Sequence, residues 1–369
     1  MTFIPAVSAQ LKVSSRSGLS ALPPTRIAVV GAGAFGRNHV RVWRELQQAD
    51  APVELAAIID PNESVSESLR QEFQVPVYPS IEDLLLSKTK VSAASVVVPT
   101  LQHAAVASQL LRAGIDTLVE KPIAGSLQEA DSLINLAREH DRILQIGHLE
   151  RFNPAILAVR PFVHQPLFFE IHRLSVFTPR SLDIDVVMDL MIHDLDLVLS
   201  FAQSPVRELH AVGLAVLSSK IDIANVRIEF TSGCVANFTA SRVSTERVRK
   251  MRFFQPHQYV SVDYARQDAF SIDVSAPHLH SSTDDAVSRP TEPAKFFPAE
   301  LRHPTPAFTT RRLQVSPGEP LRLELQSFLH AVRSRNTPVV TGQDGRAALK
   351  LALDILKAIE AHHARTPLQ

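Results

Sequence analysis

The stretch R-I-A-V-V-G-A-G-A-F-G, from Arg26 to Gly36, joins a short apolar strand to a glycine-rich turn and the start of a helix. Gly31 permits the tight turn, Gly33 lets the backbone approach a pyrophosphate, and Gly36 allows the helix to pack closely on the strand. The helix N-terminus then faces the phosphate charge. Three glycines alone are weak support, and a glycine-rich turn without a ligand is the alternative.

An acidic residue at the end of the second predicted strand strengthens the dinucleotide interpretation. Asp60 follows Gly36 by about the 20 residues typical of such sites, and its carboxylate can accept hydrogen bonds from an adenosine ribose. It also repels a 2′-phosphate, and the residues 61–63 that follow offer no cation to bind one. We therefore predict NAD rather than NADP. The alternative is a turn-forming role, which Asp-Pro-Asn would satisfy on its own.

The pattern of strands and helices predicts two domains after a flexible leader of residues 1–25. In residues 26–147, apolar β-branched runs alternate with amphipathic helices, which predicts a doubly wound parallel sheet of the Rossmann type. In residues 148–369, strands follow one another, which predicts an α+β domain with a large, mostly antiparallel open sheet and one covering helix. This domain would bind the substrate and form oligomers, with a loop excursion at about 275–320.

The predicted elements have these limits. The strands of the first domain are residues 27–30, 53–59, 75–78, 93–98, 117–120 and 143–146, and its helices include 35–48, 104–113 and 127–139. The strands of the second domain are 168–177, 208–216, 221–230, 235–241, 248–254 and 259–264, followed by two closing helices at 321–335 and 345–361.

Composition narrows the class of protein. The chain has 369 residues, of which 45% are hydrophobic and 21% charged, as in ordinary two-domain globular proteins. Its 38 basic residues balance 38 acidic ones, so no overall field attracts a nucleic acid or a membrane surface. No apolar run is long enough to cross a membrane. The single cysteine, Cys234, cannot form an intramolecular disulfide, and we expect a cytoplasmic protein with a small-molecule ligand.

Two short loops follow predicted strands of the first domain. They are V-V-V-P-T-L-Q-H at 96–103 and V-E-K-P at 119–122. Ligands of an open parallel sheet bind beyond the carboxyl ends of its strands, so Thr100, His103 and Lys121 would lie at the reaction site. A lysine ammonium there would stabilise the alkoxide character of an alcohol that is losing its proton. A surface lysine before a proline turn is the alternative.

A third element is D-L-M-I-H-D-L-D-L at 189–197, in which a histidine and two of the three acidic residues lie at helical spacing. If helical, it places Asp189, His193 and Asp196 on one stripe, while the other faces are nearly all apolar. The polar stripe then lines either solvent or a cleft. Because imidazole titrates near neutrality, we predict His193 as the general base, with Asp189 orienting it or the substrate. An N-capping aspartate on a solvated face is the alternative.

Together these elements resemble the glucose-fructose oxidoreductase/inositol dehydrogenase (Gfo/Idh/MocA) family. The resemblance implies a Rossmann domain, oxidation of an alcohol by NAD, contact of Lys121 with the substrate hydroxyl, and association as a homodimer or homotetramer. A departure is Met191, where much of the family has glycine. The predicted cofactor-binding residues are Gly31, Gly33, Ala34, Phe35, Gly36, Asp60, Pro99, Thr100, His103, Glu120 and Lys121.

The segments G-H-L-E-R-F-N-P-A at 147–155 and V-A-N-F-T-A-S-R at 235–242 resemble the branch of the family that oxidises UDP-N-acetylglucosamine at C3. Such a substrate needs cations for its diphosphate. Arg151, accompanied by Asn153, is the first candidate, and the predicted substrate-binding set also includes Lys121, Asp189 and His193. The other candidate cations are Arg173 and Arg180, and a second cluster of Arg247, Arg249, Lys250 and Arg252. Each of these arginines could equally lie on a solvated strand face or in a subunit contact.

Two other functions stay open at this stage. One is a dehydrogenase of a free sugar or of inositol, and the other is an NAD-binding sensor without turnover. No set of His, Cys and carboxylate residues has a recognisable metal-ligand spacing, so we predict no metal site. The open sheet of the second domain would leave apolar residues uncovered on one face, which favours a homo-oligomer.

Overall fold

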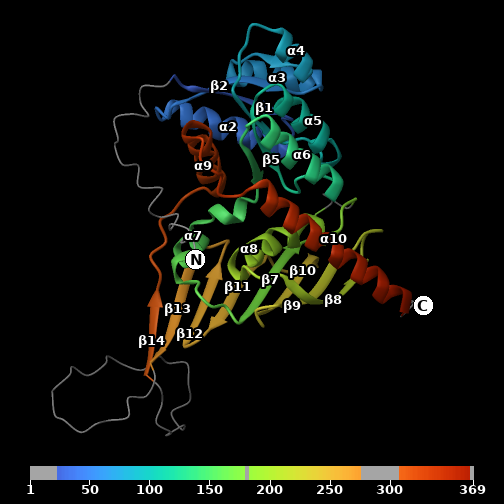
Figure 1. Cartoon of the computed structure of the whole chain (residues 1–369), viewed down its shortest axis with the longest axis vertical. Helices are drawn as coiled ribbons and strands as arrows, with labels where there is room; N and C mark the ends of the chain where they lie inside the picture. Colours follow the sequence, from blue (N-terminus) through green and yellow to red (C-terminus); the bar gives the residue numbers. More distant parts are fainter. Residues whose placement is uncertain (1–22, 179–182, 276–306, 366–369) are drawn as a thin grey trace, which may run out of the picture.

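The computed structural model describes residues 23–178, 183–275 and 307–365. Residues 1–22 of the predicted leader, Arg180, and residues 276–306 of the predicted excursion lie outside the described residues. The described part of the chain begins in the first domain and ends at the C-terminal end of the last helix (Figure 1).

The first domain is a six-stranded parallel sheet in the order β3-β2-β1-β4-β5-β6, which confirms the predicted doubly wound fold. Strands β1 and β2 are buried on both faces except at one partly exposed residue each, as their apolar runs require. Their bounds are β1 (Thr25–Val30), β2 (Val53–Ile59), β3 (Val77–Tyr78), β4 (Ala93–Val96), β5 (Asp116–Glu120) and β6 (Leu144–Gly147). The helices are α2 (Ala34–Gln48), α3 (Glu63–Phe73), α4 (Ile81–Leu86), α5 (Thr100–Arg112) and α6 (Leu127–Glu139).

The second domain is an eight-stranded sheet in the order β14-β13-β12-β11-β7-β10-β9-β8. All neighbours are antiparallel except β7 and β10, so the predicted mostly antiparallel sheet is confirmed. The bounds are β7 (Phe168–Val176), β8 (Val206–Leu214), β9 (Ile223–Phe230), β10 (Val235–Ser244), β11 (Val248–Gln255), β12 (Gln258–Asp263), β13 (Asp268–Ser275) and β14 (Ala307–Arg312). The last two strands were not predicted, and β14 lies inside the segment expected to be an excursion.

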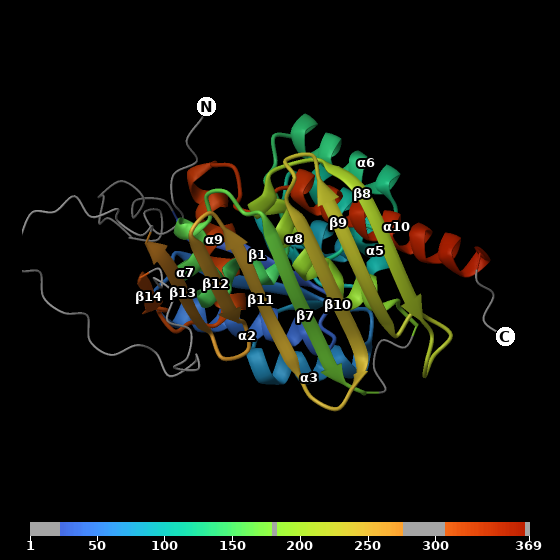
Figure 2. The ribbon, with the colours of Figure 1, turned by 90° about the horizontal axis from the view of Figure 1, so that it is seen from below.

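The helices of the second domain lie on one face of this sheet (Figures 1 and 2). They are α7 (Pro154–Val159), α8 (Ile192–Ala202) and α10 (Gly342–Arg365), so the prediction of a single covering helix is wrong. Strand residues alternate accordingly: on β9, Val226 and Ile228 are buried under the helices, while Asn225 and Arg227 are exposed on the other face. Among the described residues, no helix covers that other face (Figure 2).

The chain returns to the first domain after the large sheet. Helix α9 (Pro320–Ser334) packs beside α2, and its Leu325 and Phe328 join the same buried cluster as Trp43 (Figure 1). Helix α10 then contributes Leu349 to the core of the first domain and Ile355 to the core of the second. The two domains are therefore joined by shared packing as well as by the connection after β6.

Candidate active site

The glycine-rich loop has the geometry expected of a phosphate-binding turn. Gly31 has a φ of +85°, and a Cβ there would meet the Val97 carbonyl oxygen at 2.6 Å. A Cβ on Gly36 would lie 2.0 Å from the Gly31 carbonyl oxygen, so neither position accepts a side chain. Around the Cβ position of Gly33, by contrast, no described atom lies within 4 Å. That open space lies at the N-terminus of α2, whose first turn has no acidic side chain, and the loop therefore fits a pyrophosphate.

Asp60 lies at the end of β2, next to this loop. Its Oδ2 accepts a hydrogen bond from the Ala32 backbone N–H at 2.8 Å, and its Oδ1 accepts one from Asn62 at 2.9 Å. The carboxylate thus holds the glycine loop against the turn after β2. Each oxygen keeps a second lone pair, which is what a ribose hydroxyl needs.

His103 links the two loops that follow β4 and β5. Pro99 caps α5, and Thr100 begins it, while His103 one turn later is buried. Its Nδ1 lies 2.7 Å from the Pro122 carbonyl oxygen and its Nε2 lies 2.9 Å from the Val98 carbonyl oxygen. Burial lowers the pKa of His103, and a neutral ring donates to only one of these carbonyls. His103 therefore fixes the two loops relative to each other.

Glu120 is held in a buried polar cluster behind Lys121. His39 Nε2 lies 3.2 Å from Glu120 Oε1, and the Lys121 backbone N–H donates to Oε2 at 3.3 Å. A side chain at Gly147 would displace this carboxylate, because a Cβ there would lie 2.7 Å from Glu120 Oε1. Glu324 of α9 is also fully buried, and burial together with Glu120 raises its pKa well above the ordinary value. Sequence reasoning missed His39 and Glu324, since neither belongs to a motif.

Lys121 reaches from the end of β5 to the second domain. Its Nζ donates a hydrogen bond to the Asp189 carbonyl oxygen at 2.8 Å and lies 3.6 Å from Asp189 Oδ1. Asp189 lies in a π-helical turn, η3 (Val187–Met191), which directly precedes α8, so the predicted single α-helix is interrupted at this point. His193 follows in the first turn of α8. The structure thus brings together the three predicted catalytic side chains, Lys121, Asp189 and His193.

The His193 ring is partly exposed, while its Nδ1 is buried and has no hydrogen-bond partner among the described residues. Burial lowers the pKa of His193 well below the usual 6.5, and the nearby charges of Lys121 and Arg173 lower it further. The ring is therefore neutral at pH 7 and can accept a proton. Nε2 is the nitrogen left to meet a substrate.

Asp196, the third member of the predicted stripe, does not line the site. It is 1% exposed, and the Arg151 guanidinium donates to both of its oxygens, from Nε at 2.5 Å and from the second nitrogen at 2.8 Å. Asp344 adds a second carboxylate 3.6 Å from Arg151. The hypothesis that Arg151 binds a diphosphate is therefore corrected: its charge is neutralised inside the protein, where it ties the turn η1 (Leu149–Phe152) to α8 and α10.

Asn153 and Arg173 are also engaged internally. Asn153 caps α7 by accepting from the Ala155 N–H at 3.1 Å, and it donates to Glu150 and to the Tyr264 carbonyl. Arg173 donates to Asp194 at 2.6 and 2.9 Å and to Glu150 at 3.0 Å. Because all of these groups are buried, the prediction that Asn153 binds substrate is corrected as well, and Arg173 is no better placed to do so.

His148 is a further residue that sequence reasoning did not single out. In the parallel pair β5 and β6, Glu120 lies beside Gly147, so His148 follows at the same end of the sheet as Lys121. Its side chain is 1% exposed, and neither ring nitrogen has a partner among the described residues. Burial lowers its pKa, and it is close enough to His193 to lower the pKa of that ring too. A histidine directly after a strand-ending glycine is the signal that could have identified it.

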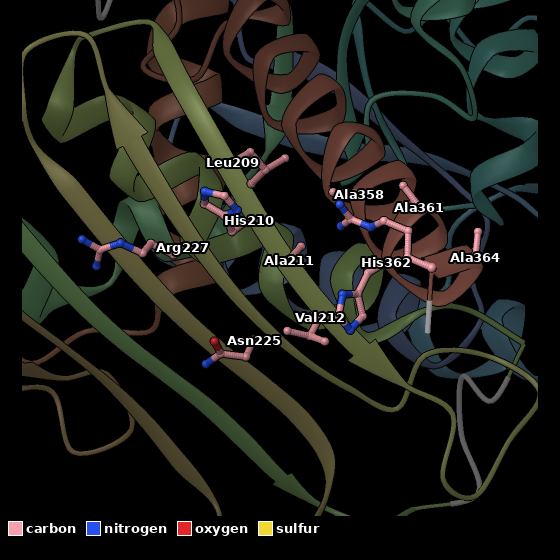
Figure 3. A pocket seen from close by; sticks show the side chains of 11 residues that line it. Leu209, His210, Ala211, Val212, Asn225, Arg227, Ala358, Ala361, His362 and Ala364 are labelled. Atoms are coloured by element: carbon pink, nitrogen blue, oxygen red, sulfur yellow. The ribbon is translucent and has the colours of Figure 1, made fainter. Parts of the chain in front are cut away.

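A pocket of about 630 Å³ lies elsewhere, between β8 and the C-terminal end of α10 (Figure 3). His210, Arg227 and His362 are among its lining residues, and it contains none of the residues around Lys121. Within the described ranges, no helix is long and apolar enough to span a bilayer, and no three His, Cys, Asp or Glu side chains form a group that could hold a metal ion.

Comparison with known proteins places this geometry in a family. Residues 25–148 match the profile of the oxidoreductase family with an NAD-binding Rossmann fold, and residues 156–255 match the GFO/IDH/MocA C-terminal domain. The chain belongs to the Gfo/Idh/MocA family. It is an oxidoreductase of that family with a site for a nicotinamide dinucleotide, as the resemblance of its loops implied.

Relatives within the Gfo/Idh/MocA family differ in what they act on. The chain is 34% identical to a UDP-N-acetylglucosamine 3-dehydrogenase of Acidithiobacillus ferrooxidans over 91% of its own length and 97% of the relative. The solved structure of that protein superposes with a TM-score of 0.78, at 32% identity, covering 92% and 99% of the two chains. A myo-inositol 2-dehydrogenase of Thermotoga maritima is 23% identical over 91% and 96% of the two lengths. The WlbA dehydrogenase from Bordetella pertussis, solved with NADH and UDP-GlcNAcA, shares the fold at 16% identity and a TM-score of 0.69, covering 92% and 97%.

Proposed function

We propose that this Gfo/Idh/MocA oxidoreductase uses NAD to oxidise the C3 hydroxyl of UDP-N-acetylglucosamine to the 3-keto sugar. The observation that carries the proposal is the similarity, at 34% identity over nearly its whole length, to a UDP-N-acetylglucosamine 3-dehydrogenase. Lys121, hydrogen-bonded to the Asp189 carbonyl and close to His193, supports it chemically. A 3-keto product is suited to an aminotransferase that makes a 3-amino sugar for lipid A or another envelope glycan.

In this mechanism His193 is the general base. Its neutral ring accepts the hydroxyl proton through Nε2 as the C3–H bond breaks, and the proton then leaves to solvent. Lys121 donates a hydrogen bond to the substrate oxygen and stabilises its developing negative charge. Asp189 holds the Lys121 ammonium in place through its carbonyl and carboxylate oxygens. When bound, NAD supplies the acceptor for the hydride that leaves C3.

The preference for NAD over NADP is part of the same proposal. The Asp60 carboxylate lies beside the glycine loop, where a 2′-phosphate would meet a negative charge rather than a cation. Gly33 and the first turn of α2 would hold the pyrophosphate.

We also propose that the uncovered face of the large sheet joins two copies of the chain, in a homodimer or a homotetramer. A row of aromatic rings crosses that face, with centroids 5.9 Å apart for Phe168 and Phe254, 5.0 Å for Phe254 and Tyr259, and 5.8 Å for Tyr259 and Phe270. These aromatic side chains would be buried if the same face of a second copy of the chain packed against them.

The experiment that tests the proposed function is a substrate screen that follows NADH formation. UDP-N-acetylglucosamine, other UDP-sugars, free N-acetylglucosamine and myo-inositol are each offered with NAD. We expect NADH only with UDP-sugars, and most rapidly with UDP-N-acetylglucosamine. Turnover of free sugars or inositol instead would support the second candidate, and binding of NAD without any turnover would support a sensor.

A further inference from the structure

Strand β11 presents basic side chains to both faces of the large sheet. Met251 and Phe253 are buried under the helices, so Arg249 lies on that same face, whereas Lys250 and Arg252 lie on the uncovered face. In the pairing of β11 with β7, Arg249 lies directly opposite Arg173. Two guanidinium groups are therefore neighbours on the face that α8 covers.

The acidic groups at this place are bound to only one of the two arginines. Asp194, the residue after His193, accepts two hydrogen bonds from Arg173, and Glu150 accepts a third. Among the described residues, the Arg249 side chain makes no hydrogen bond and no ion pair, and its Nε is buried without a partner. The two cations on the other face differ in this respect, because Lys250 lies 3.9 Å from Asp263 and Arg252 donates to Glu170 at 2.5 Å.

An arginine in this environment is suited to an anion. Burial lowers the pKa of the Arg249 guanidinium, and the neighbouring charge of Arg173 lowers it further, so an approaching anion would relieve an unfavourable state of the free protein. The guanidinium also offers a planar set of donors that matches the oxygens of phosphate.

The position of Arg249 relates it to the reaction. Arg249 lies opposite Arg173, and Arg173 donates to Asp194, the residue after His193, so an anion bound to Arg249 lies near the predicted base. In a UDP-sugar the diphosphate is attached to C1, two carbons from C3, and therefore also lies near the reacting group. Free sugars and inositol carry no such anion.

We infer that Arg249 binds the diphosphate of the nucleotide sugar and thereby selects UDP-sugars over uncharged sugars and polyols. This inference rests on the proposed function, and it replaces Arg151 with Arg249 as the diphosphate ligand. Lys250 and Arg252 belong to the same predicted cluster, but they are excluded as diphosphate ligands because they lie on the uncovered face of the sheet.

The test compares Arg249→Met with Lys250→Met, a neighbouring change on the opposite face of the same strand. Loss of hydrogen bonds to a charged group should raise the KM for UDP-N-acetylglucosamine about 10- to 100-fold in Arg249→Met, with a smaller effect on kcat. Lys250→Met should leave KM unchanged, and both variants should keep the wild-type Kd for NAD. Arg249→Lys keeps the charge without the planar donors and should recover part of the affinity.

Calorimetry with UDP and with uridine gives a second readout that needs no turnover. The wild-type protein should prefer UDP, and Arg249→Met should lose that preference. The inference is overturned if Arg249→Met has the wild-type KM for UDP-N-acetylglucosamine and still prefers UDP to uridine. If Arg249→Met fails to bind NAD, the same two results in Arg249→Lys overturn it. If the wild-type protein oxidises no UDP-sugar, the proposed function fails separately, and the UDP and uridine titrations still decide whether Arg249 binds a diphosphate.

Discussion

Replacement of Arg151 by methionine tests whether this arginine is structural. Methionine keeps much of the side-chain volume but leaves Asp196, 1% exposed, without the cation that donates to both of its oxygens. Breaking a buried ion pair from one side costs about 3–5 kcal/mol, because a charge stays behind without compensation. At roughly 2–4 °C for each kcal/mol in a domain of this size, the melting temperature should fall by about 6–20 °C.

Differential scanning fluorimetry measures the loss, and two further variants identify its origin. Arg151→Met combined with Asp196→Leu removes both charges and should recover most of the stability. Arg312→Met breaks an exposed pair with Asp268 at 2.9 Å and should cost no more than about 1 kcal/mol. The reasoning is refuted if Arg151→Met melts at the wild-type temperature while its KM for UDP-N-acetylglucosamine rises sharply, since that result describes a substrate ligand.

The remaining predictions concern the cofactor, the base and the assembly. His193→Asn should lower kcat about 10²- to 10⁴-fold with little change in NAD affinity, and near-wild-type turnover would mean that the base lies elsewhere. The activity of the wild-type protein should fall only as pH drops well below 6.5, because the neutral His193 ring is the active form and the pKa of His193 is lowered. Lys121→Ala removes one cause of this lowered pKa, so the residual activity of that variant should fall at a higher pH than the wild-type activity. Asp60→Ala should weaken NAD binding and reduce discrimination against NADP. The preference for NAD is contradicted if the wild-type protein binds NADP as tightly as NAD, or more tightly. Light scattering at micromolar concentration should find a dimer or tetramer that Tyr259→Glu dissociates, whereas a wild-type monomer would contradict the proposed interface.

Local patterns in the sequence were sufficient to predict most of the fold. Strand β2 and helix α6 have the predicted limits, and α6 begins at a capping box in which Ser126 and Glu129 bond each other's backbone. The glycine loop was equally readable, because a positive φ and close backbone contacts require glycine at Gly31 and Gly36. The capping box joins neighbours in the chain, and the glycine motif is contiguous in the sequence, although the contact of Gly31 with Val97 is not local.

The errors concern contacts between distant segments. Nothing near Arg151 in the sequence indicates that Asp196 neutralises it, and its position after a Rossmann strand made it look available to a ligand. Helix α9 was recognised as a helix, but its packing on α2 depends on the route of the whole chain. Likewise Arg249 could not be separated from Lys250 and Arg252 until the face of β11 that each occupies was known.

Deuterium transfer from the substrate tests the central claim most directly. UDP-N-acetylglucosamine carrying deuterium at C3 is incubated with the protein and NAD, and mass spectrometry follows the label. The account predicts deuterated NADH, a 3-keto sugar nucleotide without the label, and slower turnover than with unlabelled substrate where the C–H bond breaks in the slow step. Formation of NADH with all of the deuterium retained in the sugar, or no NADH from UDP-N-acetylglucosamine at all, would contradict it.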